Sequence, residues 1–95
     1  MQNSRSGEAK APYSDELNDV VDLPTMTTGA LNALGQDEDG FSVMIEGGAI
    51  DWAGHGNNPV RDIEETQDFN KSVDAAIKWV EENSSWEETL LVVTA

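Results

Sequence analysis

The chain has 95 residues, and 19 aspartates and glutamates against five lysines and arginines give it a formal net charge of −14 at pH 7. A chain of this length forms one small domain and buries only about two-thirds of its unfolded surface, so a large enclosed active site is not expected. The charge excludes nucleic acid as a partner, because phosphate binding needs clustered Lys and Arg. The lack of cysteine excludes disulfides and thiolate metal sites. No segment approaches the roughly 18 consecutive apolar residues of a membrane span.

The start of the chain is polar and shows little periodicity. Residues 1–22, which include MQNSRSGEAKAPYS, therefore predict a flexible or irregular N-terminal arm, and residues 23–95 are expected to form the folded part. The arm lacks the apolar stretch of a signal peptide, so the chain as written is expected to be soluble.

A short helix is predicted over residues 25–34. Pro24 suits the first turn of a helix. Four apolar residues then recur at the spacing of one helical face: Met26, Ala30, Leu31 and Leu34. Gly35 stands where a left-handed C-terminal cap is expected, and QDEDG at residues 36–40 predicts a turn.

Two apolar runs are typical of buried strands, and a long helix is predicted between them. FSVMI at residues 41–45 lacks clean alternation, as a strand covered on both faces does, and TLLVVT at residues 89–94 is rich in β-branched residues. Residues 46–59 form a glycine-rich loop, and residues 61–82 follow as a helix. Its apolar stripe consists of Phe69, Val73, Ala76, Ile77 and Val80. The charged runs DIEE and WEE are interpreted as solvated helix ends.

Strand, helix and strand in this order make a βαβ unit, so the predicted fold class is α/β with parallel strands. In such sheets, ligands bind beyond the carboxyl ends of the strands. The glycine-rich loop leaves one such end, which makes it the candidate functional site.

The loop gathers groups that could bind a metal ion. Glu46 follows the first predicted strand directly, and Asp51 and His55 are four residues apart, which places them on one face even of a single helical turn. Carboxylate with imidazole suits zinc, whereas carboxylate with water suits magnesium. A solvated loop histidine and a glycine-rich turn explain the same residues without any metal, and spacing alone leaves both interpretations open.

The stretch GFSVMIEGGAIDWAGHGNN at residues 40–58 resembles the metal-binding segment of the alkaline phosphatase family. That pattern contains an apolar strand, Glu-Gly-Gly, one residue, Ile-Asp, three residues and His. The resemblance extends to the helix DIEETQDFNKSVDAAIKWVEE, to the strand TLLVVTA and to the upstream segment APYSDELNDVVDLPTMTTGALNAL. It therefore covers about residues 12–95 and implies a βαβ fragment of a larger three-layer α/β/α fold.

The resemblance implies that Glu46 is a magnesium ligand and that Asp51 and His55 are two ligands of one zinc ion. Enzymes of this family hydrolyse phosphate monoesters through a phosphoserine intermediate, at a site with two zinc ions and one magnesium ion. It also implies a periplasmic or extracellular location and allows a homodimeric parent enzyme. Two protein ligands are one fewer than a catalytic zinc site normally has.

The chain departs from the family pattern in several places. It shows no candidate for the nucleophilic serine motif, for the phosphate-binding arginine or for the aspartate that bridges zinc and magnesium, and the Asp-His pair expected after VVTA is missing. We therefore interpret it as a fragment of a phosphatase, inactive alone. The alternatives are a non-catalytic acidic module that binds a divalent cation or a partner, and a related metal-dependent hydrolase of diesters or sulfate esters.

Overall fold

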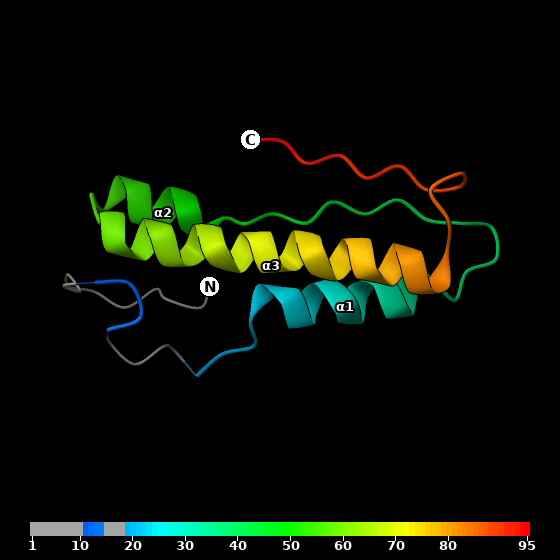
Figure 1. Ribbon diagram of the computed structural model, residues 1–95, viewed down its shortest axis with the longest axis horizontal. Helices are drawn as coiled ribbons and strands as arrows, with labels where there is room; N and C mark the ends of the chain where they lie inside the picture. Colours follow the sequence, from blue (N-terminus) through cyan, green and yellow to red (C-terminus); the bar gives the residue numbers. More distant parts are fainter. Residues whose placement is uncertain (1–10, 15–18) are drawn as a thin grey trace.

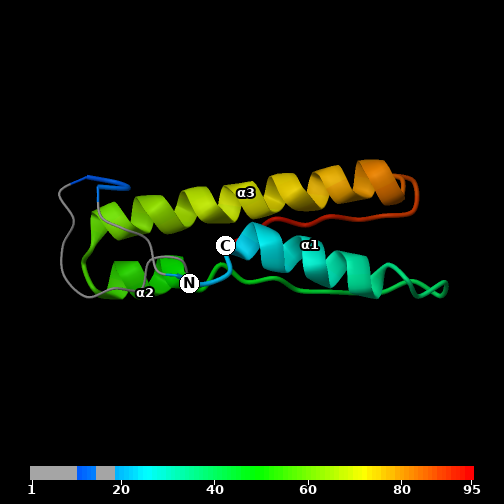
Figure 2. The ribbon, with the colours of Figure 1, turned by 90° about the horizontal axis from the view of Figure 1, so that it is seen from below.

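The structure is a computed structural model that describes residues 11–14 and 19–95. Within these residues it contains three helices, α1 (Leu23–Leu34), α2 (Ala49–His55) and α3 (Pro59–Asn83). Figures 1 and 2 both show α3 as the long axis, with α2 beside its N-terminal part and α1 beside its C-terminal part. The two shorter helices contact α3 but not each other. Helix α3 is therefore the common support of the molecule.

Capping residues explain where the two larger helices begin. The Asp22 side chain accepts a hydrogen bond of 2.9 Å from the backbone N–H of Thr25, and Pro24 lies in the first turn of α1. At the start of α3, Asn58 accepts from the backbone N–H of Arg61 at 3.3 Å, directly before Pro59. Both predicted helices are confirmed, and each begins two residues before its predicted start.

The predicted left-handed cap at Gly35 is wrong. Gly35 has φ −66° and ψ −9°, which is right-handed. Glycine is needed there because the Trp79 ring of α3 lies against it: a Cβ at Gly35 would lie 2.5 Å from Trp79 Cζ2. The indole Nε1–H donates to Asn32 Oδ1 at 2.9 Å, and Phe41 packs edge-on against the ring with centroids 5.9 Å apart.

The predicted α/β fold and its βαβ unit are also wrong, because the described part of the chain is helical and contains no strand or sheet. Figure 1 shows the two segments predicted as strands running alongside α3 as irregular chain. No backbone hydrogen bond joins residues 41–45 to residues 89–94. Leu90 is 87% exposed and Met44 is 85% exposed, so the apolar runs are not buried either. An apolar run indicates a preference for burial, but a strand also needs a neighbouring backbone to pair with.

One face of α3 carries the buried residues, and it changes character along the helix. Near the C-terminal end, Ala76 and Val80 pack with Leu31 of α1 as the buried apolar core of the described residues. Towards the N-terminus the same face is polar, with these buried residues: Arg61, Glu64, Glu65, Asp68 and Ser72. The predicted stripe is thus confirmed at Ala76 and Val80, while its other members are half-buried. The interpretation of DIEE as a solvated helix end is wrong for Glu64 and Glu65.

Two further expectations concern the N-terminal arm and the membrane. Most of the predicted arm, residues 1–10 and 15–18, lies outside the described residues, and residues 11–14 and 19–22 contain neither helix nor strand. The division into an arm and a domain stays a prediction. Of the helices that the structure describes, none has both the length and the apolar character needed to cross a bilayer.

Candidate metal centre

The predicted glycine-rich loop contains a helix. Residues 49–55 form α2, which follows Gly48 and ends at Gly56, and Asn57 then adopts a left-handed conformation with φ 51°. This turn reverses the chain into α3. Glu46 lies just before α2, and Asp51 and His55 lie on it.

The structure brings Asp51 and His55 together. His55 Nε2 lies 3.4 Å from Asp51 Oδ2, as the four-residue spacing indicated. The side chains are 81% and 75% exposed, for His55 and Asp51 respectively, so both groups face solvent. A carboxylate oxygen and an imidazole nitrogen held this close can share one cation from outside the helix.

The donor set fits a borderline-soft divalent ion but is incomplete. Imidazole with carboxylate suits zinc, and a catalytic zinc site normally has three protein ligands. No cluster of three His, Cys, Asp or Glu side chains that could hold a metal occurs in residues 11–14 and 19–95. Glu46 therefore does not form such a cluster with Asp51 and His55, and a zinc ion on this pair would need a third donor from elsewhere.

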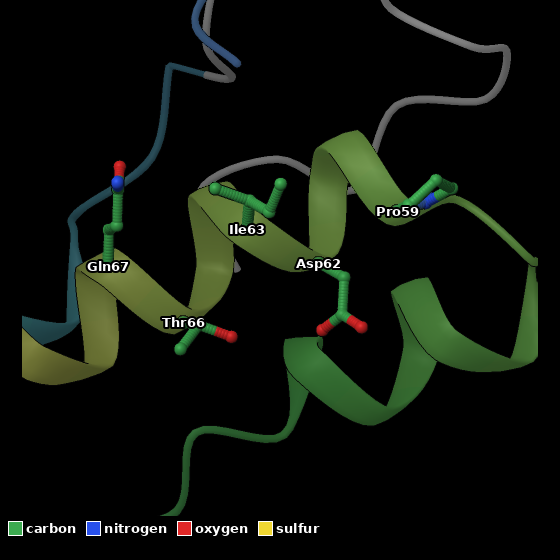
Figure 3. A pocket seen from close by; sticks show the side chains of 5 residues that line it. All are labelled: Pro59, Asp62, Ile63, Thr66 and Gln67. Carbon is green, nitrogen blue, oxygen red and sulfur yellow. The ribbon is translucent and has the colours of Figure 1, made fainter. Parts of the chain in front are cut away.

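Sequence reasoning missed Asp62, which lies where α2 and α3 meet. Figure 3 shows its carboxylate pointing towards α2, whereas Ile63 and Gln67 point away. Its Oδ1 atom is buried and accepts no hydrogen bond from the described residues. These side chains, with Pro59 and Thr66, line a hollow of about 350 Å³ on the first turns of α3. Its wall carries one acidic group and no basic one, so it does not suit a phosphate group.

Sequence reasoning also missed a buried ion pair in the first turns of α3. Arg61 Nη1 lies 3.4 Å from both carboxylate oxygens of Glu64, and both side chains are at most 3% exposed. The backbone N–H of Tyr13 donates to Glu64 Oε1 at 2.6 Å, which holds the N-terminal segment against α3. The i, i+3 spacing of Arg61 and Glu64 was the available signal, but the hydrogen bond from Tyr13 comes from 51 positions before Glu64 and could not be read from that spacing.

Asp68 makes a second contact between α3 and the chain that precedes it. Its Oδ2 accepts a hydrogen bond of 3.4 Å from the backbone N–H of Leu23, at the start of α1. Burial raises the pKa of Asp68, and the charge of Asp22 adds to this, although the hydrogen bond from Leu23 opposes it. The available signal for Asp68 was the spacing of four residues that leads back from Val80 through Ala76 and Ser72 to position 68.

Comparison with known proteins identifies relatives of this chain. The family model for alkaline phosphatase matches residues 10–95. Alkaline phosphatase 3 of Bacillus subtilis is 41% identical over 81 residues, which is 85% of this chain and 17% of that protein. Alkaline phosphatase 4 of the same organism is 37% identical over 94% of the chain and 18% of its own length. Alkaline phosphatase of Escherichia coli is 33% identical over 88% of the chain and 17% of its own length. No solved structure matched.

Proposed function

The chain belongs to the alkaline phosphatase family, and from this premise we propose that it supplies three metal ligands to a metal-dependent phosphatase. Asp51 and His55 bind one zinc ion together, and Glu46 binds magnesium. The observation that supports this proposal is the 3.4 Å approach of His55 Nε2 to Asp51 Oδ2 on the exposed face of α2. Neither side chain has to leave the helix to reach a common ion.

The reaction proposed for the whole enzyme is hydrolysis of phosphate monoesters. Bound zinc would neutralise charge on the phosphate oxygens and activate the water that releases phosphate. The roles of this chain are ligation and orientation. Asp51 contributes a negative charge and His55 contributes a neutral nitrogen donor. The turn of α2 sets the spacing of the two side chains, and the packing of α2 on α3 fixes the position of the helix that carries them.

The matched part of the chain corresponds to 17–18% of the length of the relatives named above. The nucleophile, the phosphate-binding arginine and the remaining metal ligands are therefore assigned to other parts of the enzyme. On this proposal the 95 residues alone hydrolyse no phosphate monoester, with or without added zinc and magnesium. The family also supports a periplasmic or secreted location, and a homodimer is the proposed assembly.

Alanine substitution in the whole phosphatase tests the zinc assignment. We expect Asp51→Ala and His55→Ala each to lower the zinc content and to slow hydrolysis of a chromogenic phosphate ester by at least about 10-fold, because each removes a direct ligand. Asp39→Ala, an exposed acid in the turn after α1, is the matched control. Full activity and full zinc content in both ligand variants would refute the assignment.

A non-catalytic acidic module is the second candidate, and the net charge of −14 favours it. Such a module should bind its cation without help from other protein segments. Calorimetric titration of the 95-residue chain with zinc and with magnesium separates the two candidates. Two exposed ligands predict weak zinc binding, whereas tight binding of either ion by the chain alone would favour the module.

A further inference from the structure

The backbone just after Glu46 lies against an aromatic ring of α3. A Cβ atom at Gly47 would lie 2.8 Å from Cδ2 of Phe69, closer than real Cβ atoms approach a neighbour, and 3.3 Å from Cγ, which is a tight contact. Gly47 does not have a positive φ, so backbone handedness does not explain the glycine. The contact with Phe69 explains it, because only a residue without a side chain lets the backbone come this close.

The candidate loop is therefore fixed to α3 at two separate points. Its far end is fixed where Asn58 caps α3, and its near end where Gly47 meets Phe69. Phe69 lies ten positions after Pro59, which is about 15 Å along a helix axis. Helix α2, with seven residues, spans about 10 Å and packs on α3 within this interval. Helix α3 thus sets the distance between the two ends of the loop.

We infer that Phe69 is a positioning residue for Glu46: its ring, acting through Gly47, fixes where the Glu46 carboxylate stands relative to Asp51 and His55. Glu46 directly precedes Gly47 in the chain. Oε1 of Glu46 lies 3.6 Å from the position that a Cβ atom at Gly48 would take, so the Glu46 side chain lies beside the backbone that contacts Phe69. This inference rests on the proposed function of Glu46 as a magnesium ligand.

The two metals should respond differently when this contact is disturbed. Magnesium demands near-ideal octahedral geometry, so a displaced carboxylate weakens its binding strongly. The zinc ligands lie one turn apart on α2, so their spacing is set within that helix, and Gly47 contacts it through the hydrogen bond of 3.4 Å that its oxygen accepts from the N–H of Ile50. A purely structural role for Phe69 predicts instead that stability falls and that both metals are affected together.

The test uses the whole phosphatase and measures magnesium affinity by calorimetric titration, zinc content by elemental analysis and the melting temperature. We expect Gly47→Ala to weaken magnesium binding by about 10- to 100-fold, the range of substitutions that disturb a ligand's support, while zinc content stays unchanged. Phe69→Ala should weaken magnesium binding as well, because the ring that holds the backbone at Gly47 is gone. The double variant should lose little more than the larger single loss, because both substitutions disturb one contact. Val73→Ala is the matched control, because Val73 is half-buried on α3 four residues after Phe69. It should leave magnesium binding unchanged.

Two results would overturn the inference: unchanged magnesium affinity in Gly47→Ala or in Phe69→Ala, or losses of the two single variants that simply add in the double variant. Glu46→Gln separates this failure from that of the proposed function. If Glu46→Gln leaves magnesium binding intact, Glu46 is not a ligand. If it weakens binding and Gly47→Ala does not, Glu46 is a ligand that Phe69 does not position.

Discussion

The same substitution at two glycines near each other should change stability in opposite directions. Gly29 is exposed in the middle of α1, and a Cβ there would meet nothing within 4 Å. Gly29→Ala should therefore stabilise the protein by about 0.5–1 kcal/mol, because alanine loses less backbone entropy in a helix. Gly35 ends the same helix, where a Cβ would lie 2.5 Å from Trp79 Cζ2 and 2.8 Å from the backbone oxygen of Leu31.

At Gly35 neither neighbour can move away easily. The Trp79 ring is held by its hydrogen bond to Asn32 and by the edge-on contact with Phe41, and the Leu31 oxygen belongs to the backbone of α1. We expect Gly35→Ala to cost about 1–3 kcal/mol, as overpacking usually does. Urea unfolding followed by circular dichroism measures both variants. Equal stabilisation by the two substitutions would show that Trp79 does not pack on Gly35 and would refute the reasoning.

Three further outcomes are expected. Arg61→Met should lower the free energy of unfolding by about 3–5 kcal/mol, because it leaves the Glu64 carboxylate buried without its cation. Lys78→Met, which breaks an exposed pair, is the control and should lower it by at most about 1 kcal/mol. Similar losses in the thermal unfolding of both variants would contradict the buried pair. Burial raises the pKa of Asp68, so the contribution of Asp68 to stability is present below the unfolded pKa and is lost as pH rises through the folded pKa. Asp68→Asn should therefore be more stable than the parent at neutral pH and lose that advantage below about pH 4. A lower stability of Asp68→Asn at neutral pH would contradict this prediction. With a net charge of −14, melting temperature should rise between about 0.05 and 0.5 M NaCl as repulsion is screened, and no rise would argue against repulsion.

The parts of the fold that sequence reasoning predicted are those decided by neighbours in sequence. Pro24 and the apolar spacing of the two helices are local signals, and both helices were found from them. The caps Asp22 and Asn58, which the structure adds, are local as well. The 3.4 Å pair of Asp51 and His55 is equally local, because it needs only one helical turn. Helix α2 itself was missed because the glycines around it predict a loop.

The other errors share a different cause, since each depends on a partner far away in the sequence. The apolar runs at residues 41–45 and 89–94 were assigned to strands from composition, but pairing requires a second backbone, and the described chain provides none. Glu64 was assigned to solvent from its charge, but it is buried and accepts a hydrogen bond from the backbone of Tyr13, 51 residues away. Glycine at position 35 was explained by handedness, although the true reason lies on another helix.

The arrangement of the helices should let stability change without the proposed metal binding, and Gly35→Ala tests this. Helix α1 contacts α3, but it does not contact α2, which carries Asp51 and His55. The cost of Gly35→Ala arises where α1 meets the C-terminal part of α3, at the Trp79 ring on which Phe41 also packs. We therefore expect the variant of the whole phosphatase to melt at a lower temperature yet keep its zinc and magnesium affinities below the melting range. A loss of metal affinity in step with stability would mean that α3 transmits strain along its length and does not act as a rigid support.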